Sequence, residues 1–191
     1  MLSRYGLLGT IKLVISLLYT KVFFKQARLI RLPFDIRNKK YIQIGKNFTT
    51  GFACRIEAFP FQNNIEYCIE IGDNVQINDF VHIASINSVK IGNNVLMASK
   101  IYISDHNHGS YDDVRSDSPL IAPSQRQSKS KKIIIEDNVW IGESACILPG
   151  VTIGFGSIIG ALSVVSKSIP SYYIAVGNRA KVLKKNDIEI K

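Results

Sequence analysis

The sequence has few residues that could form disulfides or bind metal ions. It contains three cysteines, Cys54, Cys68 and Cys146, without paired or CxxC spacing, which disfavours a disulfide scaffold and favours a reducing compartment, the cytoplasm. Neither His and Cys residues nor oxygen-rich side chains occur at metal-binding spacings, so we expect no metal. No small-residue cleavage site follows the apolar run near the N-terminus, which argues against a cleavable signal peptide.

Acidic residues are nearly absent from the first 40 positions. This segment holds nine basic side chains against the single acid Asp35, whereas the other 151 residues hold 15 basic and 14 acidic side chains. The formal net charge of +9 therefore belongs to one end of the chain. A protein that binds nucleic acid through its main domain would carry the charge there, so we expect no nucleic-acid partner.

Residues 1–40 are predicted to form a basic amphipathic helical segment. From Tyr5 to Phe24, apolar residues recur at helical spacing, at Leu8, Ile11, Ile15, Leu18 and Val22. Lys12 and Lys21 interrupt this run and make it costly to span a bilayer. Two interpretations stay open: residues 1–31 contact the cytoplasmic face of the inner membrane, or the apolar face packs on the rest of the protein or on another subunit.

The main body of the sequence repeats every six residues. An aliphatic residue recurs at Ile135, Ile141, Ile147, Ile153, Ile159 and Val165, and the same period runs from Ile71 to Ile83. This period fits neither an α-helix nor an ordinary strand; it is typical of a parallel β-helix, in which each block supplies one short strand and one corner. Because stacked coils bury an apolar axis that one coil cannot, we predict an all-β fold with a β-helix over residues 41–170.

The repeat is interrupted between Ile103 and Ile135. The intervening residues begin with SDHNHG and are rich in Ser, Asp, Pro and Lys, with little to bury. Compact domains rarely carry such a long connection without a functional reason. We therefore predict that residues 104–132 form an excursion loop from one corner of the β-helix. A shorter break from Phe59 to Tyr67 is assigned to a second loop.

Three segments carry a family resemblance: DNVWIG at residues 137–142, PGVTIG at 149–154 and PSYYIAVGNRAKVLKK at 170–185. Together with the repeat, they resemble the hexapeptide-repeat acyltransferases, in the branch of the galactoside and maltose acetyltransferases and the polysaccharide O-acetyltransferases of O-antigen or colanic-acid type. The resemblance implies a left-handed coil, although parallel crossovers are otherwise right-handed. It also implies a homotrimer, a strand and short helix over residues 171–191, and acetyl transfer from acetyl-CoA to a sugar hydroxyl of a surface-polysaccharide precursor, such as a lipid-linked oligosaccharide.

Acetyl transfer from a thioester to a hydroxyl needs a general base, and histidine titrates closest to neutral pH. Set beside the family motif, His106 falls on the catalytic histidine, and Asn78 falls where related enzymes place an asparagine near the reacting hydroxyl. Both are predicted to be catalytic. Acceptor binding is assigned to the neighbours of His106, namely Asp105, Asn107 and His108, with His108 as the alternative base. His82 lies within a coil and is interpreted as structural.

Coenzyme A carries phosphate groups, so cations should line one end of its groove. Candidates follow the late coils: Lys167, Arg179, Lys181 and Lys184, with Arg179 standing where the family usually has proline. Trp140 is expected to line the cleft near the thioester. The backbone around Glu143, Ser144 and Ala161 resembles the part of the family that binds pantetheine. Cys146 has no basic neighbour in sequence, so we expect direct transfer rather than an acyl-enzyme.

Three alternatives remain open. A sugar N-acyltransferase of the same fold would use an amine acceptor. A γ-type carbonic anhydrase requires three histidines around zinc, but the spacings of His82, His106 and His108, 24 and then 2 residues, do not match that family. A non-catalytic β-helix scaffold would require the SDHNHG and Trp140 matches to be accidental.

Overall fold

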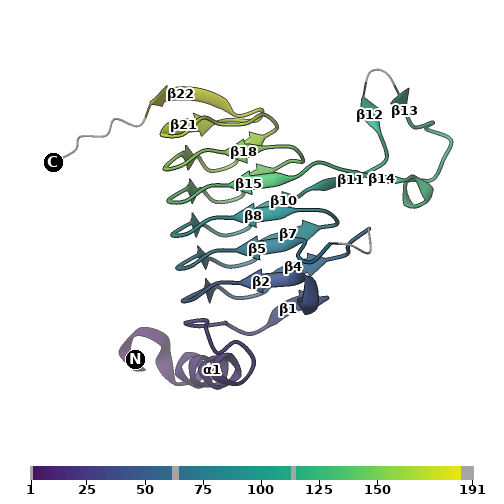
Figure 1. The fold of residues 1–191 in the computed structure, drawn as a ribbon. Coiled ribbons are helices and arrows are strands. Elements are labelled where there is room, and N and C mark those ends of the chain that lie inside the picture. Colours follow the sequence, from purple (N-terminus) through teal and green to yellow (C-terminus); the bar gives the residue numbers. More distant parts are fainter. Residues whose placement is uncertain (1, 62–64, 113–114, 186–191) are drawn as a thin grey trace.

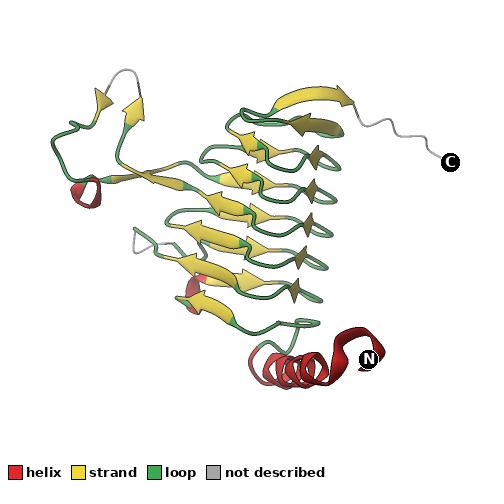
Figure 2. Cartoon of the chain, turned by 180° about the vertical axis from the view of Figure 1, so that it is seen from behind, coloured by secondary structure: helices red, strands yellow, loops and turns green. Residues whose placement is uncertain are grey.

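The computed structural model describes residues 2–61, 65–112 and 115–185. Its main body is a prism of stacked coils whose three faces are β-sheets, with α1 (Leu2–Phe23) across one end and an arm projecting from the side (Figure 1). Seen from behind, the coils run from α1 to a two-stranded hairpin at the opposite end (Figure 2).

The three faces of the prism are three sheets that we call I, II and III. Sheet I runs in the order β1 (Phe34–Arg37), β4 (Cys54–Ala58), β7 (His82–Ser85), β10 (Tyr102–Ser104), β17 (Cys146–Ile147) and β20 (Val164–Val165). Sheet II runs in the order β18 (Thr152–Ile153), β15 (Ile133–Ile135), β8 (Val89–Ile91), β5 (Ile69–Ile71) and β2 (Ile42–Ile44). Sheet III runs in the order β22 (Lys181–Lys185), β21 (Tyr173–Val176), β19 (Ile158–Ile159), β16 (Trp140–Ile141), β9 (Leu96–Met97), β6 (Gln76–Ile77) and β3 (Thr49–Thr50). Single 3₁₀ turns occur at η1 (Lys39–Tyr41) and η2 (Pro123–Gln125).

The six-residue repeat fills the axis of the prism, as predicted. All six aliphatic residues of the late repeat, from Ile135 to Val165, are at most 1% exposed. Trimming one such buried isoleucine to alanine typically costs about 2–5 kcal/mol of stability. Space is also tight at the corners, because a Cβ atom on Gly142 would lie 2.5 Å from the backbone nitrogen of Ala161.

Asparagines stack along one corner of the prism. Asn47, Asn74, Asn94 and Asn138 adopt left-handed backbone conformations with φ between 56° and 59°. Their side-chain amides form a ladder from coil to coil with spacings of 3.0–3.1 Å. Asparagine suits this corner because it tolerates positive φ and can bond its equivalent in the next coil.

After Ser104, the last residue of β10, the chain leaves the prism sideways, and the described residues from there to 132 have secondary structure of their own. β11 (His106–His108) pairs antiparallel with β14 (Ser128–Ser130), and β12 (Tyr111–Asp112) pairs with β13 (Arg115–Ser116). The Tyr111 hydroxyl donates to the His108 carbonyl at 2.6 Å and accepts from Arg126 at 2.8 Å. We call this segment the arm. At its base, the Lys131 amide donates to the Asp105 carbonyl at 2.9 Å, which joins the returning chain to the residue before β11.

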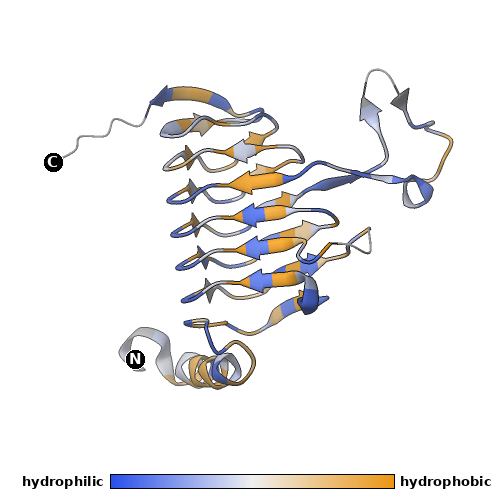
Figure 3. Ribbon diagram, viewed as in Figure 1, coloured by the Kyte–Doolittle hydropathy of each residue, from blue (hydrophilic) through white to orange (hydrophobic). Residues whose placement is uncertain are grey.

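The apolar stripe of the N-terminal helix does not pack on the prism of its own chain, which was one of the open interpretations. The buried residues of the helix are the polar Ser16 and Thr20, while the predicted apolar stripe, Leu8, Ile11, Ile15, Leu18 and Val22, is exposed. Thr20 Oγ1 accepts the Ile30 amide at 2.8 Å, and Ser16 Oγ accepts the Leu32 amide at 3.2 Å. The end of the prism thus offers backbone donors that need acceptors, and small hydroxyl side chains meet that need. In Figure 3, where colour marks residue hydropathy, hydrophobic residues in orange alternate with paler ones along α1.

The C-terminal segment forms strands where a short helix was expected. β22 pairs antiparallel with β21 and closes the end of sheet III, with a register shift between Ile174 and Ala175. The edge of β21 has unpaired backbone groups that a strand can satisfy and a helix cannot. The helix prediction is therefore wrong for residues 171–185, and residues 186–191 lie outside the described residues.

Candidate active site

The candidate site centres on His106, where the chain leaves sheet I and enters the arm. His106 follows the last strand residue of β10 by two positions and begins β11. The pairing of His106 with Ser130 fixes its backbone, and its side chain is 18% exposed. The imidazole is therefore held at a corner of the prism with part of its ring open to solvent.

Asp105 orients this imidazole. Its Oδ1 atom lies 2.9 Å from His106 Nδ1, and Ser104 Oγ lies 3.2 Å from the same nitrogen. No described residue forms a hydrogen bond to Nε2, the other ring nitrogen. Because the carboxylate accepts the Nδ1 proton, the lone pair of the neutral ring lies on Nε2, where a general base needs it.

The carboxylate of Asp105 is itself held on every side. It is fully buried, and it accepts hydrogen bonds from Ser85 Oγ at 2.7 Å and from the amides of Ile86, Asn87 and Ser88 at 2.8–3.0 Å. Burial alone would raise the pKa of Asp105, but the bonds from His106, Ser85 and the backbone outweigh burial and lower it. Asp105 was predicted to bind the acceptor; it is instead buried behind His106, and its oxygens are occupied by donors of the protein.

His82 forms a second imidazole–carboxylate pair, on sheet I. Its Nε2 lies 2.9 Å from Glu57 Oε1, and its Nδ1 lies 3.1 Å from the Arg55 guanidinium. Arg37 bonds the other oxygen of Glu57 at 3.1 Å. Both nitrogens of His82 are therefore occupied, which agrees with its interpretation as a structural residue.

The other two predicted acceptor residues share β11 with His106. His108 lies on the same face, with ring centroids 6.3 Å apart. Asn107 points to the opposite face, as alternation along a strand requires, and lines a cleft of about 290 Å³ with Lys129, Lys131 and Ser166. The arm thus presents imidazoles on one face and amide and ammonium groups on the other.

Asn78 and most of the predicted cofactor residues lie at a different corner, between sheets III and I. Asn78 follows β6, Glu143 and Ser144 follow β16, and Ala161 follows β19, on strands of the same sheet. Trp140, on β16, is 49% exposed. The Leu162 amide donates to the Glu143 carbonyl at 2.8 Å, which joins the last two coils. Sheet I separates this corner from His106, so one chain does not bring Asn78 to the imidazole.

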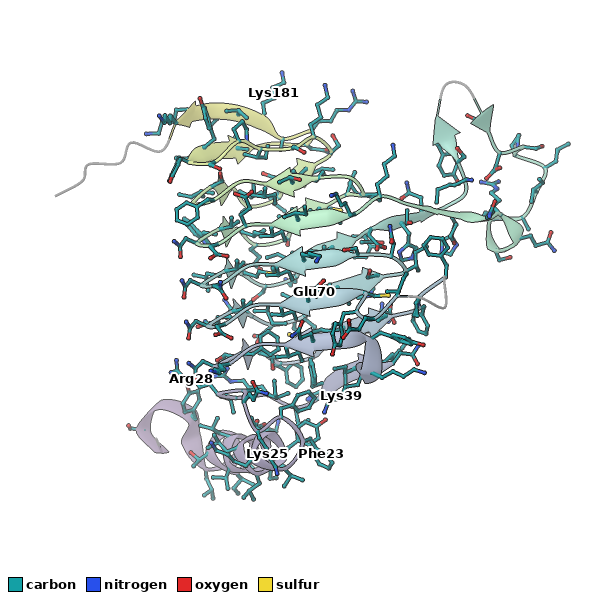
Figure 4. The ribbon with its side chains drawn as sticks, in the orientation of Figure 1. Phe23, Lys25, Arg28, Lys39, Glu70 and Lys181 are labelled. Atoms are coloured by element: carbon teal, nitrogen blue, oxygen red, sulfur yellow. The ribbon has the colours of Figure 1, made fainter. Side chains whose placement is uncertain are left out.

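The predicted phosphate-binding cations are all exposed near the end of the prism that lies opposite α1. Lys167 follows β20, Arg179 lies in the turn between β21 and β22, and Lys181 and Lys184 lie on β22. Figure 4 shows Lys181 at this end, far from the basic residues labelled near α1. The four cations therefore lie beyond the Trp140 corner along the prism, although on different elements.

The remaining candidate chemistries lack a suitable group among the described residues. Burial raises the pKa of the Cys146 thiol, which disfavours the reactive thiolate. Within residues 2–61, 65–112 and 115–185, no cluster of three His, Cys, Asp or Glu side chains could hold a metal ion. Sequence reasoning missed Ser85, because its bond to Asp105 depends on the stacking of coils 20 residues apart. It also missed Ser104, which lies only two residues from His106.

Comparison with known proteins agrees with this fold. The family model described as bacterial transferase hexapeptide (six repeats) matches residues 132–167. The chain is 47% identical over 191 residues to a protein of Escherichia coli (strain K12) named "Putative lipopolysaccharide biosynthesis O-acetyl transferase WbbJ", and the match covers 99% of this chain and 94% of WbbJ. It is 29% identical over 158 residues to the galactoside O-acetyltransferase of Lactococcus lactis subsp. lactis (strain IL1403), with 82% and 70% covered.

Solved structures share the fold. The maltose O-acetyltransferase from Clostridium difficile 630 matches with a TM-score of 0.63 and 30% identity, over 78% of this chain and 73% of that chain. A mutant of AntD, an N-acyltransferase from Bacillus cereus in complex with dTDP-4-amino-4,6-dideoxyglucose and coenzyme A, matches with a TM-score of 0.72 and 24% identity, over 90% and 89%. These likenesses support the predicted left-handed coil.

The β-helix fold and these relatives together place the chain among the acyltransferases. With the similarity to WbbJ over nearly its whole length, the chain belongs to the hexapeptide-repeat family of bacterial transferases, and it is an acyltransferase.

Proposed function

We propose that the protein transfers acetyl from acetyl-CoA to a sugar hydroxyl of a surface-polysaccharide precursor, with His106 as general base. The observation that carries this proposal is the Asp105–His106 pair, in which Nδ1 is bonded and Nε2 is left open. The relatives support the acceptor class, because WbbJ is named for lipopolysaccharide biosynthesis and two other matches are named as galactoside and maltose O-acetyltransferases.

The proposed reaction is a direct transfer. His106 Nε2 takes the hydroxyl proton while the sugar oxygen bonds to the thioester carbonyl carbon. Collapse of the tetrahedral intermediate breaks the carbon–sulfur bond, and the imidazolium returns the proton to the departing sulfur of coenzyme A. Asp105 stabilises the imidazolium formed between these steps, because its buried carboxylate lies 2.9 Å from Nδ1. Cys146 takes no part.

We propose a homotrimer as the working form, since each chain separates the two halves of its site. Asn78 and Trp140 lie at one corner, and His106 lies at another, across sheet I. In a ring of three prisms, one corner of each copy can face the other corner of its neighbour. Asn78 would then position the acceptor hydroxyl beside the neighbour's imidazole, and Asn107 and His108 would contact the acceptor.

Acetyl-CoA would lie in the groove between copies. Trp140 would cover the thioester end, and the backbone at Glu143, Ser144 and Ala161 would bond the pantetheine chain. Lys167, Arg179, Lys181 and Lys184 would approach the phosphates at the end of the prism. Because acetyl-CoA is made in the cytoplasm and the described cysteines are free thiols, we place the reaction there.

The test is an acetylation assay with purified protein, acetyl-CoA and oligosaccharide acceptors, in which thiol release and the mass of the glycan are followed together. We expect a gain of one acetyl group in an ester that mild base removes. Absence of transfer to any glycan would contradict the proposal. A product that resists mild base would be an amide and would support sugar N-acyl transfer, the activity named for AntD.

A further inference from the structure

The outward face of α1 is an exposed apolar surface that the proposed reaction does not use. Only 11% of the apolar stretch Tyr5–Phe23 is buried, and by length and composition this stretch could cross a membrane. Leu8 and Leu18 are 76% and 64% exposed, and Phe23 is 58% exposed at the end of the helix. Exposed apolar surface of this extent marks an interaction site.

Cations surround this apolar face. Lys12 and Lys21 lie on α1, and Lys25, Arg28, Lys39 and Lys40 follow it, all of them exposed. Figure 4 shows Phe23, Lys25, Arg28 and Lys39 together at the α1 end of the prism. No acidic residue precedes Asp35 in the sequence. The end of the molecule thus combines apolar side chains with unbalanced positive charge.

We infer that the outward face of α1 binds the surface of an anionic lipid bilayer, with α1 lying in the interfacial layer and the prism standing away from the membrane. Apolar side chains flanked by Lys and Arg are what such a layer accepts. A second copy of the chain is a poor occupant, since two such faces would bring their cations together. This inference does not depend on acetyl transfer.

Contacts with the first coil fix α1 across the end of the prism instead of through the bilayer. The Ile30 and Leu32 amides donate to Thr20 and Ser16, so insertion of α1 would strip both bonds. Lys39 Nζ also bonds the Phe23 carbonyl at 2.8 Å at the end of α1. Insertion would in addition carry Lys12 into hydrocarbon.

Membrane docking also sets the distance of the active site from the membrane surface. This part of the inference rests on the proposed function. β10 is the third strand beyond β1 in sheet I, which places it about 14 Å further from α1 than β1 at the usual spacing of strands. His106 follows β10. An acceptor anchored in the same membrane would therefore reach His106 with a sugar some way along its glycan, not with the sugar attached to the lipid.

Vesicle flotation of the full chain tests the docking without any substrate. We expect binding to vesicles of phosphatidylethanolamine and phosphatidylglycerol, and weaker binding to phosphatidylcholine alone. The double variant Leu8→Gln/Leu18→Gln should bind about tenfold more weakly or worse. Leu120→Gln is the matched control, because Leu120 is 94% exposed on the arm, and it should bind like wild type. The vesicle affinity of Lys25→Gln/Arg28→Gln should fall about fivefold per removed cation at low salt.

Four results would overturn the docking. The first two are absence of flotation with anionic vesicles and equal flotation of wild type and Leu8→Gln/Leu18→Gln. The third is resistance of the bound protein to extraction by alkaline carbonate, which would indicate a spanning helix, and the fourth is self-association through α1 in place of vesicle binding. Circular dichroism of each variant checks that the fold is intact.

An activity comparison tests the distance of the site from the membrane surface. Leu8→Gln/Leu18→Gln should acetylate a water-soluble oligosaccharide at the wild-type rate but lose the advantage that wild type has on a lipid-linked acceptor in vesicles. Equal rates of the two proteins on the embedded acceptor would refute this step. If flotation succeeds and no acceptor is acetylated, the docking stands and the proposed function fails.

Discussion

Two imidazole–carboxylate pairs in this protein have the same contact distance and different surroundings. His106 lies 2.9 Å from Asp105 through Nδ1, and His82 lies 2.9 Å from Glu57 through Nε2. The second nitrogen of His82 meets Arg55, whereas no described residue bonds the second nitrogen of His106. The difference teaches that a short contact to a carboxylate does not make a base. The base is the ring whose remaining nitrogen can reach substrate.

The largest expected effect is on His106 itself. His106→Ala should lower kcat for acetyl transfer by about 10²–10⁴-fold, because the acceptor hydroxyl loses its base. The matched control is His82→Gln, which should keep near-wild-type kcat and lose about 1 kcal/mol of stability with its hydrogen bonds. Steady-state kinetics and urea unfolding of both variants would check this, and similar kcat losses in the two would erase the contrast between the pairs.

Removal of the Asp105 charge should have the next largest effect. Asp105→Asn keeps the size of the side chain but cannot stabilise the imidazolium, so kcat should fall by about 10²-fold or more. The KM for acetyl-CoA should stay unchanged, because the residue is buried away from the cofactor corner. Glu57→Gln provides the comparison at the second pair. An increase in KM without a fall in kcat would show that Asp105 acts on binding.

The Asp105 carboxylate should make the stability of the folded protein depend on pH. The pKa of Asp105 is lowered in the folded state, so its contribution to stability is present above its unfolded pKa, about 3.9, and is lost as pH falls through the folded pKa. At pH 7, the free energy of unfolding of Asp105→Asn should therefore be about 3 kcal/mol lower than that of wild type. Urea titrations should show this gap shrinking below pH 4, and a gap that is independent of pH would contradict the assignment.

The smallest effect is expected at Cys146, which lies beside Tyr102 on sheet I. Burial raises its pKa, and it carries no acyl group in the proposed mechanism. Cys146→Ala should therefore show kcat close to that of wild type, with no acetylated protein detectable by mass spectrometry during turnover. An inactive Cys146→Ala enzyme with an intact fold would favour covalent catalysis.

The sequence predicts the coils well, because they depend on a local pattern. An aliphatic residue every six positions can be recognised without knowing its neighbours, and Ile135 to Val165 are buried as that period requires. His106 follows from its motif. The role of Asp105 could not be predicted, since Ser85 and the amides that surround it come from the preceding coil, 17–20 residues earlier.

The packing at the two ends of the chain could not be predicted from the sequence, for a shared reason. The sequence left open whether the apolar face of the N-terminal helix contacts a membrane or packs on protein, whereas in the structure α1 buries Ser16 and Thr20 against the amides of the first coil. At the other end, β22 pairs with the free edge of β21. In each case, unpaired backbone groups at an end of the prism determine the packing. The six-residue repeat gives no information about the segments that precede and follow it.

The most direct test of the account is to find which ring nitrogen carries the proton in each histidine. Nitrogen NMR of protein labelled in its histidine rings, recorded with the rings neutral, distinguishes the two tautomers. The proposed mechanism requires a proton on Nδ1 and an unprotonated Nε2 for His106. For His82 we expect the reverse, because its ring donates to Glu57 and accepts from Arg55. A proton on Nε2 of His106 would contradict it, because that ring could not accept a proton from the acceptor hydroxyl.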